Sequence, residues 1–77
     1  MALEAEQLAA AARAQRDALL AEADGLIAPL MDGFVLGELT VEDEARLRAL
    51  SQYRKALRAV TSQAGFPRTI NWPVKPA

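Results

Sequence analysis

A helix-ending signal and a helix-starting signal lie within a few residues of each other near the middle of this chain, and together they limit how it can fold. Gly37 suits the left-handed conformation that closes many helices. Thr40 is a favoured N-cap residue, and Asp43 follows it three positions later, as in the acidic first turn of a helix. Two helices joined by so short a turn run antiparallel. The sequence therefore predicts an all-α fold built on a two-helix antiparallel hairpin.

Apolar residues repeat at helical spacing on both sides of this turn, which gives each predicted helix one apolar face. Helix one is expected over residues 16–35, with its apolar face at Leu19, Leu20, Ala23, Leu26, Ile27 and Leu30. Helix two is expected over residues 40–64, with its apolar face at Leu47, Leu50, Tyr53, Leu57 and Val60. These two faces are the predicted core of a single small helical domain that takes in residues 1–77.

Two features weaken helix one. Pro29 lacks a backbone N–H and its ring opposes the carbonyl of Gly25, so we expect a kink between these residues. The alternative is a break, with Pro29 opening a second short helix. Residues 1–15 are rich in alanine and have no large apolar side chain after Leu8, so they can fray or can pack closely against a second copy of the chain. With little surface to bury, they should add little to stability.

The last segment, residues 65–77, is expected to be an extended tail. A glycine and a proline end helix two, and two further prolines follow, so this segment cannot form the centre of a sheet. It carries Trp72, the only tryptophan of the chain. A large aromatic ring on an extended segment needs another part of the protein, or a partner, to pack against. Either the tail folds back so that Phe66, Ile70 and Trp72 cover the open side of the hairpin, or the tail is a partner-binding arm. We favour the folded-back tail.

The candidate partner-binding residues are aromatic, apolar and basic side chains of the second half of the chain, namely Phe66, Ile70 and Trp72 on the tail and Tyr53 and Arg54 on helix two. Tyr, Trp and Arg dominate the energetics of protein interfaces. The spacing of helix two places Tyr53 on its buried face. Arg54 can pair with Glu22 or Asp24 across the hairpin, or can contact a partner.

Composition excludes several classes of function. The chain has 77 residues, no cysteine and no histidine, so thiol chemistry, disulfides and the usual transition-metal sites are excluded. The densest acidic run is residues 42–44. Consecutive side chains on a helix point in different directions, so these three carboxylates cannot converge on one ion. We therefore expect neither an enzyme nor a cofactor. No apolar run approaches the roughly 20 residues that span a bilayer, and no signal peptide is recognisable, so we expect a cytoplasmic protein without a membrane partner.

Charge is distributed very unevenly along the chain. Positions 1–45 hold all 10 acidic residues and only two arginines, whereas positions 46–77 hold seven basic residues and no acidic one. In a hairpin these opposite charges face each other, so we expect them to be neutralised within the fold. In an extended arrangement the same asymmetry would favour head-to-tail association of copies.

An ordered set of residues gives this chain a family resemblance. The set consists of Ala23-Asp24, Ile27, Pro29-Leu30, Asp32, Leu36-Gly37, Thr40, Leu47, Tyr53-Arg54, Leu57, Val60, Ile70, Trp72-Pro73 and Pro76. Over about residues 16–76 the chain resembles the C-terminal region of the caudoviral tail fibre assembly proteins, the phage and prophage chaperones of tail fibres. It departs from the usual pattern at Leu50-Ser51, where relatives often have Trp-Lys, and at Met31, where they often have Gln.

The resemblance implies a non-enzymatic chaperone that helps a tail fibre protein fold and trimerise. Such a chaperone would bind the C-terminal end of the fibre in the cytoplasm of the bacterial host, and in some relatives it stays on the fibre tip of the virion. Relatives commonly have a longer N-terminal region. Two alternatives are a small nucleic-acid-binding regulator that uses the basic residues of helix two, and a structural module that forms homo-oligomers through the Ala-rich helix. A net charge of −1 counts against nucleic acid as a partner.

Overall fold

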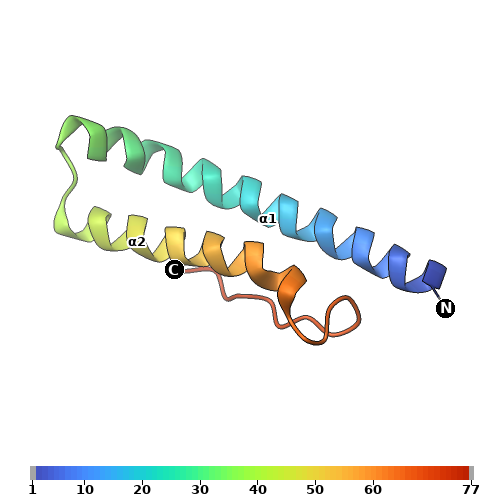
Figure 1. Cartoon of the computed structure of the whole chain (residues 1–77). Coiled ribbons are helices and arrows are strands. Elements are labelled where there is room, and N and C mark those ends of the chain that lie inside the picture. The colour runs from blue at the N-terminus through green and yellow to red at the C-terminus, as the bar shows by residue number, and fades with distance from the viewer. Residues whose placement is uncertain (1, 77) are drawn as a thin grey trace.

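Two helices run antiparallel and a tail lies beside them in the computed structural model, which describes residues 2–76 (Figure 1). Helix α1 spans Ala2–Leu36, helix α2 spans Val41–Arg58, and a short 3-10 helix, η1, spans Ala59–Ser62. The described residues contain no strand. The predicted all-α hairpin with an extended C-terminal tail is therefore confirmed.

The turn between α1 and α2 is closed by backbone hydrogen bonds and a side-chain cap. Gly37 has a φ of 70°, and the next N–H, that of Glu38, donates to the Gly33 carbonyl over 2.9 Å. This is the pattern of a left-handed C-terminal cap. At the start of α2, the Thr40 hydroxyl accepts from the Asp43 N–H over 3.1 Å. The two helix ends at the turn thus lie within one residue of the prediction, whereas α2 ends at Arg58 and η1 at Ser62, before the expected end at residue 64.

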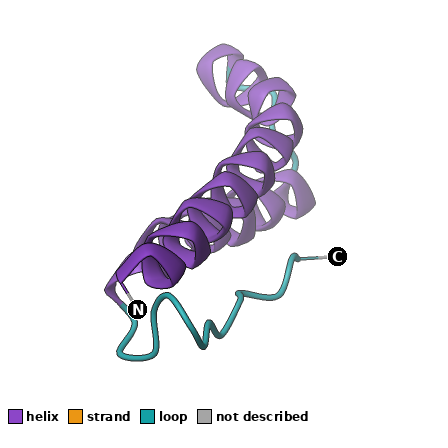
Figure 2. Cartoon of the chain, turned by 90° about the vertical axis from the view of Figure 1, so that its right-hand side faces the viewer, coloured by secondary structure: helices purple, strands orange, loops and turns teal. Residues whose placement is uncertain are grey.

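Helix α1 is one continuous helix through Pro29, so the alternative break at this proline does not occur. Figure 2 shows that α1 curves in the half that carries Pro29. Residues 2–15 belong to the same helix as residues 16–36, which differs from the expected division at residue 15. At 1.5 Å per residue, its 35 residues give a helix about 52 Å long. Helix α2, with 18 residues, covers only part of that length.

The core is a thin seam between the two helices. On α2 and η1 the predicted face is buried at Leu50, Tyr53, Leu57 and Val60, the last two at 0% exposure, while Leu47 is half-buried. On α1 the buried residues are Ala12, Ala23 and Ile27, while Leu26 and Leu30 are half-buried. The deepest line of α1 therefore runs through Ala12, Ala23 and Ile27, and Leu26 and Leu30 lie at its edge. Ala12 also lies in this seam, so the N-terminal half of α1 buries more than its composition suggests.

The molecule is a rod. Its axes measure 53 × 17 × 17 Å and its radius of gyration is 15.3 Å, against about 11 to 12 Å for a compact chain of this length. A two-helix rod has little interior, and several large apolar side chains are consequently exposed. None of the helices in the described part of the chain has the length and apolar character needed to cross a membrane.

Candidate partner-binding surface

The tail reverses direction after η1 and returns beside the hairpin (Figures 1 and 2). Thr69 donates its N–H to the Gly65 carbonyl over 2.8 Å, which closes the turn. A Cβ at Gly65 would lie 2.5 Å from the Thr69 carbonyl oxygen, so this position needs glycine. The Gln63 side chain then binds both backbone groups of Asn71, accepting from its N–H over 2.8 Å and donating to its carbonyl over 2.9 Å. These contacts direct the tail back along the helices.

Trp72 packs against the centre of the hairpin core. It lies on the buried cluster of Ala23, Tyr53 and Leu57, together with Leu19 and Leu20 of α1. Three residues later, Lys75 forms an ion pair with Glu22 of α1. Trp72 therefore contacts residues of both helices, and the tail adopts the folded-back placement.

The other residues that the sequence singled out lie at several places along the tail side of the hairpin. Tyr53 is only 6% exposed and belongs to the core cluster beneath Trp72. The Arg54 Nε lies 2.7 Å from the Asp24 Oδ1, which is one of the two pairings expected for it. Phe66 is half-buried with the Arg13 guanidinium 5.6 Å from its ring centre, and Ile70 is half-buried. Trp72 and Tyr53 are thus brought together, while Phe66 contacts a more N-terminal part of α1.

Ion pairs connect the acidic and basic halves of the chain. Arg54 pairs with Asp24, Lys75 pairs with Glu22, and Arg68 approaches Glu4 over 3.4 Å. In each pair the acid comes from α1 and the base from the second half. Part of the expected neutralisation therefore occurs, through three acidic residues of α1.

A second surface lies at the closed end of the hairpin and was not predicted from the sequence. We define the apolar tip as the five exposed apolar residues around the turn, Met31, Phe34, Val35, Leu36 and Val41. Their exposed fractions range from 43% for Met31 to 80% for Val41. Apolar residues 34–36 are consecutive and point in different directions, so they cannot all face α2. This run is the sequence signal that could have revealed the tip.

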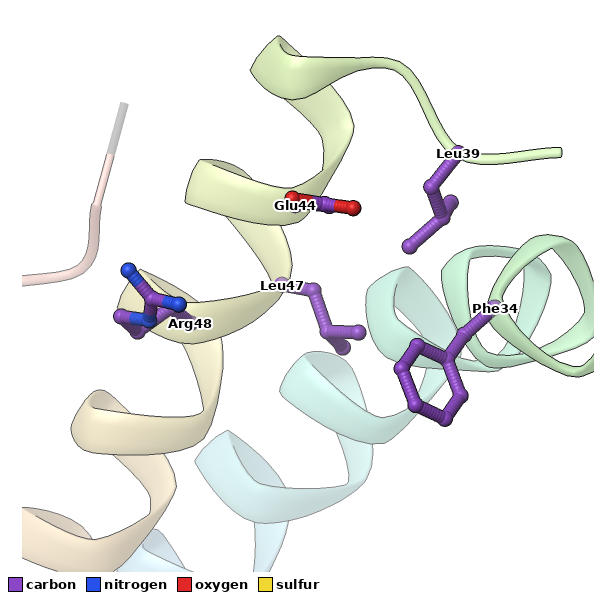
Figure 3. A pocket seen from close by; sticks show the side chains of 5 residues that line it. All are labelled: Phe34, Leu39, Glu44, Leu47 and Arg48. Carbon is purple, nitrogen blue, oxygen red and sulfur yellow. The ribbon is translucent and has the colours of Figure 1, made fainter. Parts of the chain in front are cut away.

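A hollow of about 360 Å³ opens between the two helices at the tip (Figure 3). Phe34 of α1, Leu39 of the turn and Leu47 of α2 point toward one another and form its apolar wall. Glu44 and Arg48, both on α2, add a carboxylate and a guanidinium to the lining. A hollow with an apolar wall and a few charged groups suits an apolar side chain of a partner.

The described residues contain no group of three or more acidic, cysteine or histidine side chains placed to hold a metal ion. Two surfaces are thus candidates for binding a partner: the tail, which packs on the hairpin through Trp72, and the exposed apolar tip. Both are suited to protein contacts.

A family model described as phage tail assembly chaperone protein matches residues 9–77, which include the tip, α2, the tail and most of α1. No curated protein and no solved structure matches the chain.

Proposed function

This chain belongs to the phage tail assembly chaperone family, and on that premise we propose that it assists the folding and trimerisation of a tail fibre protein. The proposed activity is binding without a catalytic step. The contact is made with the C-terminal end of the fibre, in the cytoplasm of the bacterial host, before the fibre joins the virion.

The observation that carries the proposal is the apolar tip. Phe34 is 62% exposed, Val35 is 77% exposed and Val41 is 80% exposed, and all three belong to one end of a small rod. Soluble monomers rarely leave apolar side chains grouped in this way unless the group binds something. The tip also contains a hollow, which gives it a shape that a partner side chain can fill.

The tip suits the task of an assembly chaperone. A fibre subunit that has not yet met its two partners exposes apolar surface and unpaired strand edges, which aggregate readily. An apolar tip covers part of that surface. Because the tip is small, the contact is weak enough to be replaced when the trimer closes and buries a larger area.

The tail provides a second candidate contact. Trp72, Ile70 and Phe66 are half-buried against the hairpin, and the tail is held there partly by exposed ion pairs that contribute little each. A partner that displaced the tail would reach these side chains together with Tyr53 and Arg54. The tip needs no such displacement, and it is therefore the first contact that we propose.

Co-expression with a tail fibre protein from the same phage or prophage tests the proposal. The measured quantity is the yield of soluble fibre trimer, with and without the chain. We expect the chain to raise this yield and Phe34→Gln to remove most of the gain, because a polar side chain replaces the largest apolar group of the tip.

Val74→Gln is the matched control for this assay. Val74 is 90% exposed and apolar, but it lies on the tail, away from the turn. The proposal is refuted if the chain leaves the trimer yield unchanged, or if the two variants reduce it equally.

A further inference from the structure

Five carboxylates lie close in sequence to the apolar tip, on the residues that lead into and out of the turn. These residues, which we call the acidic collar, are Asp32, Glu38, Glu42, Asp43 and Glu44. No lysine or arginine occurs between Arg16 and Arg46, so no basic residue of this stretch offsets them. Four of the five are exposed and Asp43 is half-buried. Arg46 and Arg48 follow the collar on α2, and Arg48 lines the hollow, so the tip region keeps three more acidic than basic residues and is acidic on balance.

The collar carboxylates have no ion-pair partner within residues 2–76. Within residues 2–76, four ion pairs are formed, and their acids are Glu4, Asp17, Glu22 and Asp24. All four lie in the N-terminal two thirds of α1. None of the collar carboxylates takes part in an ion pair in the described part of the chain. Of the five acidic residues outside the collar, all but Glu6 are thus paired within residues 2–76, whereas none of the five in the collar is.

Helix stability explains why some of the collar carboxylates lie where they do, but not all of them. Glu42, Asp43 and Glu44 occupy the first turn of α2, where negative charge is favoured by the helix dipole. Asp32 lies near the C-terminal end of α1, and Glu38 lies two residues beyond it. Negative charge there is disfavoured by the dipole, and the last turn of α1 has no basic residue to compensate. These two carboxylates therefore weaken the helix end instead of supporting it.

We infer that the apolar tip binds a segment of its partner that combines apolar side chains with lysine or arginine. This inference rests on the proposed function, because it specifies the chemistry of the segment that the tip covers. The apolar side chains of the segment fill the hollow of Phe34, Leu39 and Leu47, and its basic residues face the acidic collar. Complementary charge of this kind steers encounter and excludes acidic segments.

Binding of two labelled peptides to the full chain tests the inference. One peptide has a central Leu-Phe-Val run flanked by lysines, and the other has glutamates in place of the lysines. Fluorescence anisotropy at low and high salt gives their affinities. We expect the lysine peptide to bind at least about 5-fold more tightly, and this difference to shrink at high salt because the collar is exposed.

A charge-neutralising double variant locates the effect. Asp32→Asn with Glu38→Gln removes two collar charges and leaves the first turn of α2 intact. It should weaken binding of the lysine peptide by about 3-fold to 10-fold. Glu6→Gln with Asp17→Asn removes two acidic charges far from the tip and should change the affinity by less than about 2-fold. Thermal unfolding of both double variants checks that each remains folded.

Three results would overturn the inference: equal affinity for the two peptides, no binding of either peptide, or equal loss in the two double variants. A fourth is a dimer in sedimentation that Asp32→Asn with Glu38→Gln dissociates, because the basic half of a second copy would then occupy the collar. The fibre assay is separate. If Phe34→Gln lowers trimer yield while both peptides bind equally, the proposed function stands and the inference fails. If the chain leaves trimer yield unchanged while the lysine peptide binds preferentially, the proposed function fails and the preference of the tip for basic apolar segments stands.

Discussion

Replacing Trp72 by alanine tests whether the tail is part of the folded core. Trp72 is half-buried and packs on Ala23, Tyr53 and Leu57, so its removal uncovers the centre of the hairpin. Loss of a fully buried large aromatic side chain costs about 3 to 5 kcal/mol, and we expect about 2 to 3 kcal/mol here because Trp72 is partly exposed. At about 4 to 8 °C per kcal/mol for a domain of this size, Tm should fall by about 8 to 24 °C.

Circular dichroism measures this change, and Val74→Ala is its control. Val74 lies two residues further along the same tail and is 90% exposed, so its truncation should cost under about 0.5 kcal/mol. Trp72 is the only tryptophan, so its emission reports the tail directly and should shift to longer wavelength in urea. Equal Tm values for the two variants, with emission that urea leaves unchanged, would refute the docking of Trp72.

Two further predictions concern the helices. Leu57→Ala should cost about 2 to 4 kcal/mol in urea unfolding, because Leu57 has 0% exposure. Arg58→Ala on the exposed side should cost under about 0.5 kcal/mol, so equal costs would contradict the assigned face of α2. Deleting residues 2–15 should lower Tm by several degrees, because this segment contains the buried Ala12 and contacts the tail through Arg68. An unchanged Tm would show that the segment adds nothing.

Local signals allowed much of the fold to be predicted. Gly37 and Thr40 define the turn through their own backbone preferences, which need no distant contact. The face of α2 follows from regular spacing, since Leu50 and Leu57 are both buried as the pattern requires. The sequence does not show which apolar residue of α1 lies deepest in the core, because this depends on how the two helices cross.

Two features of the candidate surfaces could not be predicted, for different reasons. The hydrogen bonds between Gln63 and Asn71 join two loop positions that have no periodic pattern, so the path of the tail is not readable from spacing. The apolar tip could not be predicted because apolar residues beside a turn can equally well pack against the turn itself. Leu39 does pack against Gly33, but Phe34 and Val35 remain 62% and 77% exposed, because no further element of the described chain covers them.

Photo-crosslinking to the fibre protein tests the central claim most directly. A benzophenone amino acid at position 34 should crosslink to a co-expressed tail fibre subunit, whereas the same amino acid at position 74 should give little product. Both positions are exposed, at 62% and 90%, so accessibility alone favours position 74. Mass spectrometry of the adduct should place the crosslink in a segment near the C-terminal end of the fibre. Crosslinking at position 74 with none at position 34 would contradict binding through the apolar tip.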